Sequence, residues 1–87
     1  PEPRILVSLA TYNEAGNVAA LIAEIHKFVP RADVLVIDDN SPDGTWQIVA
    51  DMGAADPRVK LLRRGDKLGL GTAILAAMNY AMDHGYD

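Results

Sequence analysis

The sequence predicts an α/β fold built on a parallel sheet with helices on its faces. Short apolar runs alternate with segments of helical periodicity in the order β-α-β-α-β-α. The apolar runs begin near residues 5, 34 and 59, so each unit has about the 30 residues of a βα module. With right-handed crossovers, these units predict a Rossmann-like sheet of strand order 3-2-1.

The first half of the chain predicts two strands and the helix between them. Residues 5–10 form a short apolar run, typical of a buried strand. The next apolar residues recur in steps of three and four, which predicts a helix with Asn13 as its N-cap and Pro30 as its stop. Residues 34–37 predict the second strand, and the turn-forming residues 40–44 follow it closely.

The second half repeats the pattern. A helix is expected from Thr45 to about Ala55, and Asp56-Pro57 ends it. A third strand is expected around Val59–Leu62. The last helix runs from Thr72 to about His84, before a C-cap glycine. Its apolar face is expected to comprise Ile74, Ala77, Met78, Ala81 and Met82.

Composition limits the class of protein. The 87 residues make at most one domain, and 49% hydrophobic with 23% charged residues is ordinary for a globular chain. A net charge of −4 argues against nucleic acid as a partner. There is no cysteine, no apolar run near the ~20 residues of a membrane span, and no signal segment. A cytoplasmic protein is expected, without cysteine metal sites.

Ligands of open parallel sheets bind at the carboxyl ends of the strands. Two polar segments, 11–14 and 38–43, follow the first two strands and are expected to converge there. Tyr12 suits stacking on a base or covering the core, and Asn13 and Glu14 suit either ligand contacts or a helix start. Adjacent strand residues face opposite ways, so only one acid of Asp38-Asp39 should enter the cleft. Alternatively, these acids bond the following turn, where Asp43 is expected as a turn or cap residue.

A glycine-containing loop precedes the last helix. Lys67, Gly69 and Gly71 suit the phosphate side of a ligand, because helix N-termini bind anions. The spacing fits neither G-x-G-x-x-G nor the Walker A loop, so the signal is weak alone. Arg63 and Arg64, with Lys67, are either a solvated surface or face phosphate at a ligand or membrane. His26 and His84 have no partners at metal-ligand spacing, and no Ser-His-Asp set is visible.

Three strings in order resemble the family-two glycosyltransferases of the A-type fold. They are T-Y-N-E at 11–14, V-I-D-D-N-S-P-D-G-T at 36–45 and K-L-G-L-G-T-A at 67–73. The second and third strings, and D-P-R-V at 56–59, resemble the dolichyl-phosphate or polyprenyl-phosphate mannose synthase branch. The resemblance covers essentially the whole chain. It implies a nucleotide-diphospho-sugar transferase fold of which residues 1–87 are the N-terminal nucleotide-binding part.

The resemblance also implies residue roles. Tyr12 and Glu14 correspond to nucleotide contacts, while Ile37 and Asp39 flank the base, with Asp39 accepting its N–H. Ala10 stands where the family usually has proline, so it still lines the pocket but the loop is less rigid. In the family, a D-x-D motif on the next strand holds Mg²⁺ or Mn²⁺ and the sugar diphosphate. That motif is expected beyond residue 87, so no metal ligand or catalytic residue is assigned in the chain itself.

The function implied is inverting transfer of a hexose, chiefly mannose, from a nucleotide-diphosphate sugar to a polyprenyl (dolichyl) phosphate. The enzyme would work at the cytosolic membrane face, as in cell wall biogenesis, and the 87 residues alone are expected to be inactive. The base, the sugar and the acceptor are not determined by the sequence. The alternative is a non-catalytic doubly wound module, such as a receiver-like regulatory domain. Arg63-Arg64 at the end of the third strand argues against it, since a receiver has Thr or Ser at the equivalent strand end.

Overall fold

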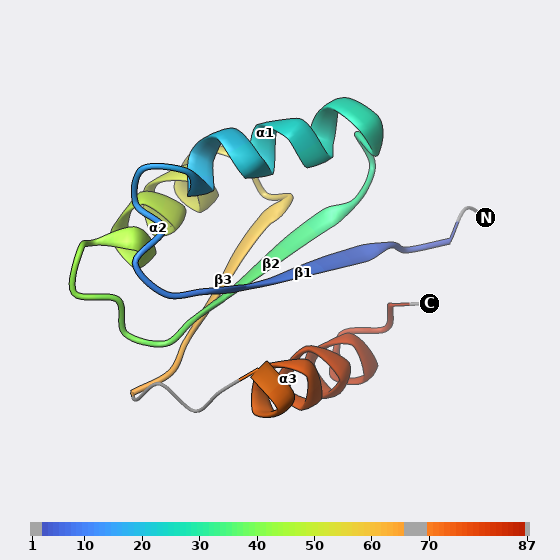
Figure 1. The fold of residues 1–87 in the computed structure, drawn as a ribbon. Coiled ribbons are helices and arrows are strands. Elements are labelled where there is room, and N and C mark those ends of the chain that lie inside the picture. The colour runs from blue at the N-terminus through green and yellow to red at the C-terminus, as the bar shows by residue number, and fades with distance from the viewer. Residues whose placement is uncertain (1–2, 66–69, 87) are drawn as a thin grey trace.

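The fold is a three-layer arrangement of one sheet between helices (Figure 1). The computed structural model describes residues 3–65 and 70–86. The three strands and three helices alternate along the chain as expected: β1 (Leu6–Thr11), α1 (Val18–Phe28), β2 (Asp33–Asp38), α2 (Thr45–Ala55), β3 (Val59–Arg63) and α3 (Leu70–Asp83).

The sheet is parallel, with β2 between β1 and β3, which confirms the predicted strand order. Val7 of β1 pairs with Val34 of β2, and Val34 pairs in turn with Val59 of β3. The α1 and α2 helices cover one face of the sheet and α3 covers the other (Figure 1). All three strands therefore end at the same edge, and the loops that follow β1 and β2 meet there.

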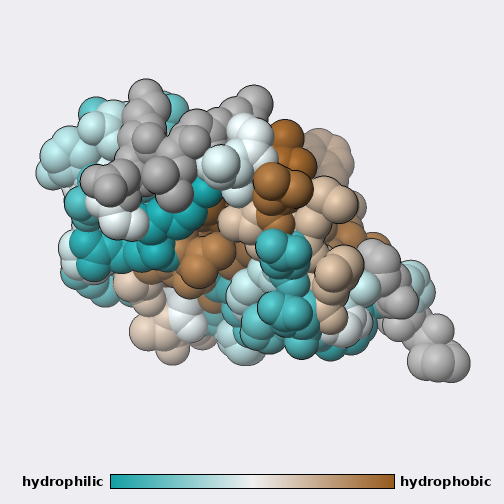
Figure 2. All heavy atoms as spheres, turned by 90° about the horizontal axis from the view of Figure 1, so that it is seen from below, coloured by the Kyte–Doolittle hydropathy of each residue, from teal (hydrophilic) through white to brown (hydrophobic). Residues whose placement is uncertain are grey.

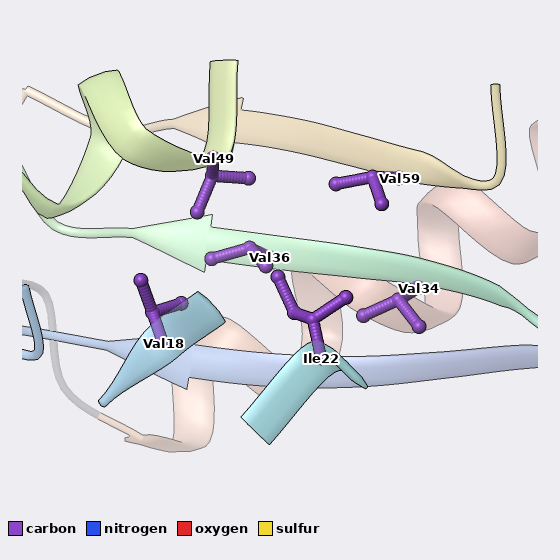
Figure 3. Close-up of a cluster of buried hydrophobic side chains, with 6 residues drawn as sticks. All are labelled: Val18, Ile22, Val34, Val36, Val49 and Val59. Carbon is purple, nitrogen blue, oxygen red and sulfur yellow. The ribbon is translucent and has the colours of Figure 1, made fainter. Parts of the chain in front are cut away.

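Alternating side chains of β2 supply both halves of the core. Val34 and Val36 are fully buried against the α1 and α2 side, where Val18, Ile22, Val49 and Val59 complete the cluster (Figure 3). Leu35 and Ile37 are buried against α3 on the other face. This is the period of a central strand covered on both faces, and it explains why residues 34–37 are continuously apolar.

The α3 helix packs through small residues, which corrects its expected apolar face. Ala73 and Ala77 are buried against Leu35 and Ile37. Of the five residues expected to face the sheet, only Ala77 is buried, whereas the large side chains Ile74, Met78 and Met82 are more than half exposed. Helical periodicity predicts that a helix has an apolar stripe. It does not predict that the small alanines of that stripe, rather than its large residues, contact the sheet. The face on the α3 side accordingly shows hydrophobic surface among hydrophilic residues (Figure 2). No helix in the described ranges is both long and apolar enough to cross a membrane.

The start of α1 is also corrected. The helix begins at Val18 with Asn17 as its N-cap, not at Asn13. Asn13 lies before that N-cap and has a φ of 57°, in the left-handed region. The segment between β1 and α1 instead forms a loop whose backbone is bonded to the loop after β2.

Candidate nucleotide site at the carboxyl edge of the sheet

The two acids that end β2 have different surroundings. Asp38 follows the face of Val34 and Val36, and Asp39 follows the face of Leu35 and Ile37, because successive residues alternate. Asp38 is fully buried, and 8% of Asp39 is exposed. That only one of the two carboxylates enters a ligand cleft stays a prediction.

Asp38 organises the interior of the edge. Its Oδ1 accepts hydrogen bonds from the hydroxyls of Thr11, at 2.7 Å, and Ser41, at 2.6 Å. Its Oδ2 accepts the backbone N–H of Ser41 at 2.9 Å. Three donors satisfy a buried carboxylate and join the end of β1 to the turn after β2.

Side chains of the second loop also hold the backbone of the first. The N–H groups of Asn13, Glu14 and Ala15 donate to Ser41 Oγ at 2.9 Å, Thr45 Oγ1 at 2.9 Å and Asp43 Oδ2 at 3.0 Å. Asp43 also bonds the first residue of α2, since its Oδ1 accepts the N–H and the hydroxyl of Thr45, while Gly44 is the N-cap of the helix. The hydrogen bond from the Thr45 hydroxyl, and those from backbone N–H groups, hold the pKa of Asp43 below its usual value. Of the two roles expected for Asp43, turn or cap, the structure shows that of a turn residue, because the N-cap is Gly44.

Asp39 pairs with an arginine from the neighbouring strand. Arg64 Nε lies 2.6 Å from Asp39 Oδ1 and Arg64 Nη2 lies 3.0 Å from Oδ2, a two-pronged ion pair with both side chains nearly buried. Arg64 Nη1 donates to Thr72 Oγ1 on α3 at 3.0 Å. The pair therefore ties the end of β2 to the first turn of α3.

The other candidate residues lie around the outer edge of β1. A hollow of about 340 Å³ on the α1 side is lined by residues that include Ala10, Glu14 and Leu21. A smaller hollow on the α3 side is lined by Ser8, Ala10, Ile37, Ala73 and Ile74. The structure thus places Ala10 beside both Glu14 and Ile37. Tyr12 is 38% exposed, and neither it nor Asp39 lines these two hollows, so a single cleft of Tyr12, Glu14 and Asp39 stays a prediction.

The basic residues after β3 have separate partners. The Arg63 guanidinium lies 3.7 Å from the centre of the Trp46 ring and donates to Asn40 Oδ1 at 2.9 Å. Arg64 is turned toward Asp39 rather than to the outside. Gly71 lies in the first turn of α3, with open space where a side chain would be. Lys67 and Gly69, predicted for the phosphate side, lie outside the described residues.

Sequence reasoning missed two features of this edge. Arg64 is expected from the sequence either on a solvated surface or facing phosphate at a ligand or membrane, whereas it pairs with Asp39. The hydroxyls of Ser41 and Thr45 were passed over as turn and helix residues. Their signal was present, since Ser41, Asp43 and Thr45 alternate in S-P-D-G-T directly after a strand that ends in acids.

Comparison with known proteins identifies the family of the chain. Residues 7–84 match the model of the glycosyl transferase family 2. The chain is 40% identical over 87 residues to a polyprenol monophosphomannose synthase of Mycolicibacterium smegmatis. It is 40% identical over 84 residues to an undecaprenyl-phosphate mannosyltransferase of Micrococcus luteus. It is 31% identical over 80 residues to a dolichol-phosphate mannosyltransferase of Pyrococcus furiosus.

The alignments cover nearly all of this chain but a minor part of each relative. They include 99%, 97% and 90% of the chain, against 33%, 35% and 22% of the three relatives. The chain therefore spans about a third or less of the length of these proteins. A mannosyltransferase of Pyrobaculum calidifontis, solved in complex with GDP-Man and Mn²⁺, superposes with a TM-score of 0.78 at 27% identity. That superposition covers 93% of this chain and 25% of the other.

The family model spans the sheet, all three helices and both loops of the carboxyl edge. The superposition supports the same assignment of the fold. The chain belongs to the family 2 glycosyltransferases.

Proposed function

We propose that this chain is the nucleotide-binding part of an enzyme that transfers mannose from a nucleotide-diphosphate sugar to a polyprenyl phosphate. The observation that carries the proposal is 40% identity, across nearly the whole chain, to two mannosyltransferases named for polyprenyl-phosphate products or acceptors. The structural neighbour, solved with GDP-Man, supports a guanine nucleotide as the donor's carrier. The same relatives favour the transferase over a receiver-like module.

The nucleotide is proposed to bind at the carboxyl edge, against Tyr12, Glu14, Ile37 and Asp39, with Ala10 in the wall. Asp39 is suited to accept an N–H of the base, because it is a slightly exposed carboxylate at this edge that Arg64 holds in place. Arg64 fixes the orientation of both carboxylate oxygens before the ligand arrives. A preformed acceptor loses less conformational entropy when the base binds.

A divalent metal is proposed for the enzyme on the strength of the Mn²⁺ in the structural neighbour. Across residues 3–65 and 70–86, no group of three or more His, Asp or Glu side chains is arranged to hold a metal ion. The described residues therefore do not fit a metal centre. A place at the cytosolic membrane face is proposed from the polyprenyl-phosphate acceptor alone.

The test is nucleotide binding and transfer by a full-length protein that contains this chain. We expect it to form polyprenyl-phosphate mannose from GDP-mannose in the presence of Mg²⁺ or Mn²⁺. Asp39→Ala should weaken binding of the nucleotide sugar about ten- to hundredfold in calorimetry, because a hydrogen bond to a charged acceptor is lost. Asp51→Ala removes an exposed carboxylate on α2 and serves as the control. Equal affinity of the Asp39 and Asp51 variants would overturn the role of Asp39.

A further inference from the structure

We propose that Ser41 and Thr45 are positioning residues that hold the loop after β1 in its nucleotide-binding form. The inference rests on the proposed function. Its starting point is that three consecutive backbone N–H groups, at residues 13–15, all donate to side chains from Ser41, Asp43 and Thr45. We call this set of bonds the loop clasp.

In the loop clasp, the donor and the acceptor of each hydrogen bond are fixed. Ser41 Oγ donates to Asp38 at 2.6 Å, and Thr45 Oγ1 donates to Asp43 at 2.5 Å. A hydroxyl has one hydrogen, so once it is given to a carboxylate, only the oxygen lone pairs remain to meet another group. Each hydroxyl is thereby fixed as an acceptor for a backbone N–H of the first loop. Both are buried, Ser41 with 2% of its surface exposed and Thr45 with none.

The segment that the clasp holds needs such support. It contains no strand or helix until Val18, and Asn13 adopts a left-handed φ of 57°. Residues other than glycine occupy that region at an energetic cost, and the surrounding structure must compensate for it. The bond from the Asn13 N–H to Ser41 is placed at this residue. Without the clasp, the loop would sample other backbone conformations.

The loop that is held contributes little to the core. Tyr12, Asn13 and Glu14 are all exposed, whereas the packing of α1 on the sheet comes from Val18 and Ile22. A polar clasp of buried hydroxyls under an exposed loop therefore fixes the shape of a surface rather than the packing of the interior. Both proposed nucleotide contacts lie in this segment. Glu14 supplies one of the held N–H groups, and Tyr12 directly precedes the first of them. Ordering them in advance lowers the entropic cost of binding.

The clasp is tested in the full-length protein with Thr45→Val, which removes the hydroxyl and keeps the shape. The Kd and KM for the nucleotide sugar should rise about five- to tenfold, because the Glu14 N–H loses its acceptor and Asp43 loses a donor, while kcat changes less than twofold. Thr45→Ser keeps the hydroxyl and should restore wild-type affinity. Tyr86→Phe is the matched control, because it also deletes one hydroxyl, at the opposite edge of the sheet, where Tyr86 bonds to Asp33.

The outcomes separate the two proposals. A wild-type protein that binds no nucleotide sugar overturns the proposed function. A wild-type protein that binds, with Thr45→Val binding equally well at a temperature where both are folded, overturns the clasp. So does an equal loss of affinity in Tyr86→Phe, since the effect would then be general destabilisation. If Thr45→Val does not fold, Ser41→Ala removes the bond to Asn13 and leaves Asp38 two other donors, and the same criteria apply.

Discussion

Asp38 and Asp39 are adjacent in sequence yet have different partners, because a strand turns successive side chains to opposite faces. Asp38 is closed in by Thr11 and Ser41 and has no exposed surface. Asp39 meets Arg64 and retains slight exposure. A buried carboxylate with three donors is suited to hold loops, and a nearly buried one braced by arginine is suited to present an acceptor to a ligand. The dipeptide therefore combines a residue that supports the loops with one for which we propose a role in recognition.

A single glycine, Gly53, allows α2 to approach β3 closely. A Cβ at Gly53 would lie 2.9 Å from the backbone oxygen of Val59, closer than real side chains come. Gly53→Ala should therefore destabilise the fold by roughly 1–3 kcal/mol through overpacking against rigid backbone. Most of this range exceeds the ~1 kcal/mol that alanine gains over glycine inside a helix, so we expect a net loss of stability. The free energy of unfolding from urea titration measures the difference.

Gly71→Ala is the control for that substitution. A Cβ there has open space around it within the first turn of α3, so only the gain in helix propensity applies. The two substitutions are chemically identical and should have opposite signs. Stabilisation of both variants would show that α2 and β3 can move apart at little cost.

At the scale of elements, the strands and α2 were predictable because their signals are local. Residues 34–37 are apolar without interruption, and turn residues bound α2 on both sides. The start of α1 was not predictable in the same way. Its boundary depends on bonds from residues 13–15 to side chains about 30 residues later in the chain. Sequence periodicity carries no record of such contacts.

In the candidate site, too, some features could be predicted from the sequence and others depend on contacts between distant residues. The position of Asp39 at the edge followed from strand order, because all strands of a parallel sheet end together. Its partner Arg64 did not follow, since the pair joins the ends of two strands 25 residues apart. The orientation of α3 was missed for another reason. Alanine and the large apolar residues give the same periodic pattern, and only the close approach to β2 selects Ala73 and Ala77.

The end of α3 is fastened to the sheet by a tyrosine whose ionisation should be visible in stability. Burial, and the hydrogen bond to Asp33 at 2.5 Å, raise the pKa of Tyr86 to about 12 from 10.0. The folded state therefore binds more protons than the unfolded state between about pH 10 and pH 12. Stability from this group is complete below pH 10 and is lost as the pH rises toward 12.

Comparison of wild type with Tyr86→Phe isolates that contribution. The difference in free energy of unfolding between the two should be constant from neutral pH to about pH 10 and should change as the pH approaches 12. Denaturant titrations at a series of pH values measure it. A difference that begins to change well below pH 10 would contradict the raised pKa.

At the scale of the whole molecule, the two outer strands of the sheet, β1 and β3, differ in how well they are protected from pairing with another chain. β3 carries Lys60 and Arg63, and charged side chains discourage pairing with another strand. β1, Leu6–Thr11, has no charged residue. Hollows flank its outer side, and the exposed side chains of Leu21 and Ile74 line them from α1 and α3. Backbone groups beside exposed apolar surface favour association with another chain.

We therefore expect the 87-residue polypeptide, prepared alone, to associate through β1 as its concentration rises. Ser8→Lys should reduce this association, because Ser8 is exposed on β1 and lines both hollows, and a lysine on an edge strand disfavours pairing. Ala23→Lys adds the same charge at an exposed position on α1 and should leave association unchanged, which separates the edge effect from a general effect of net charge. Sedimentation velocity over a hundredfold range of concentration measures all three proteins. A wild-type polypeptide that stays monomeric throughout, or equal suppression by both lysines, would show that the β1 edge does not drive association.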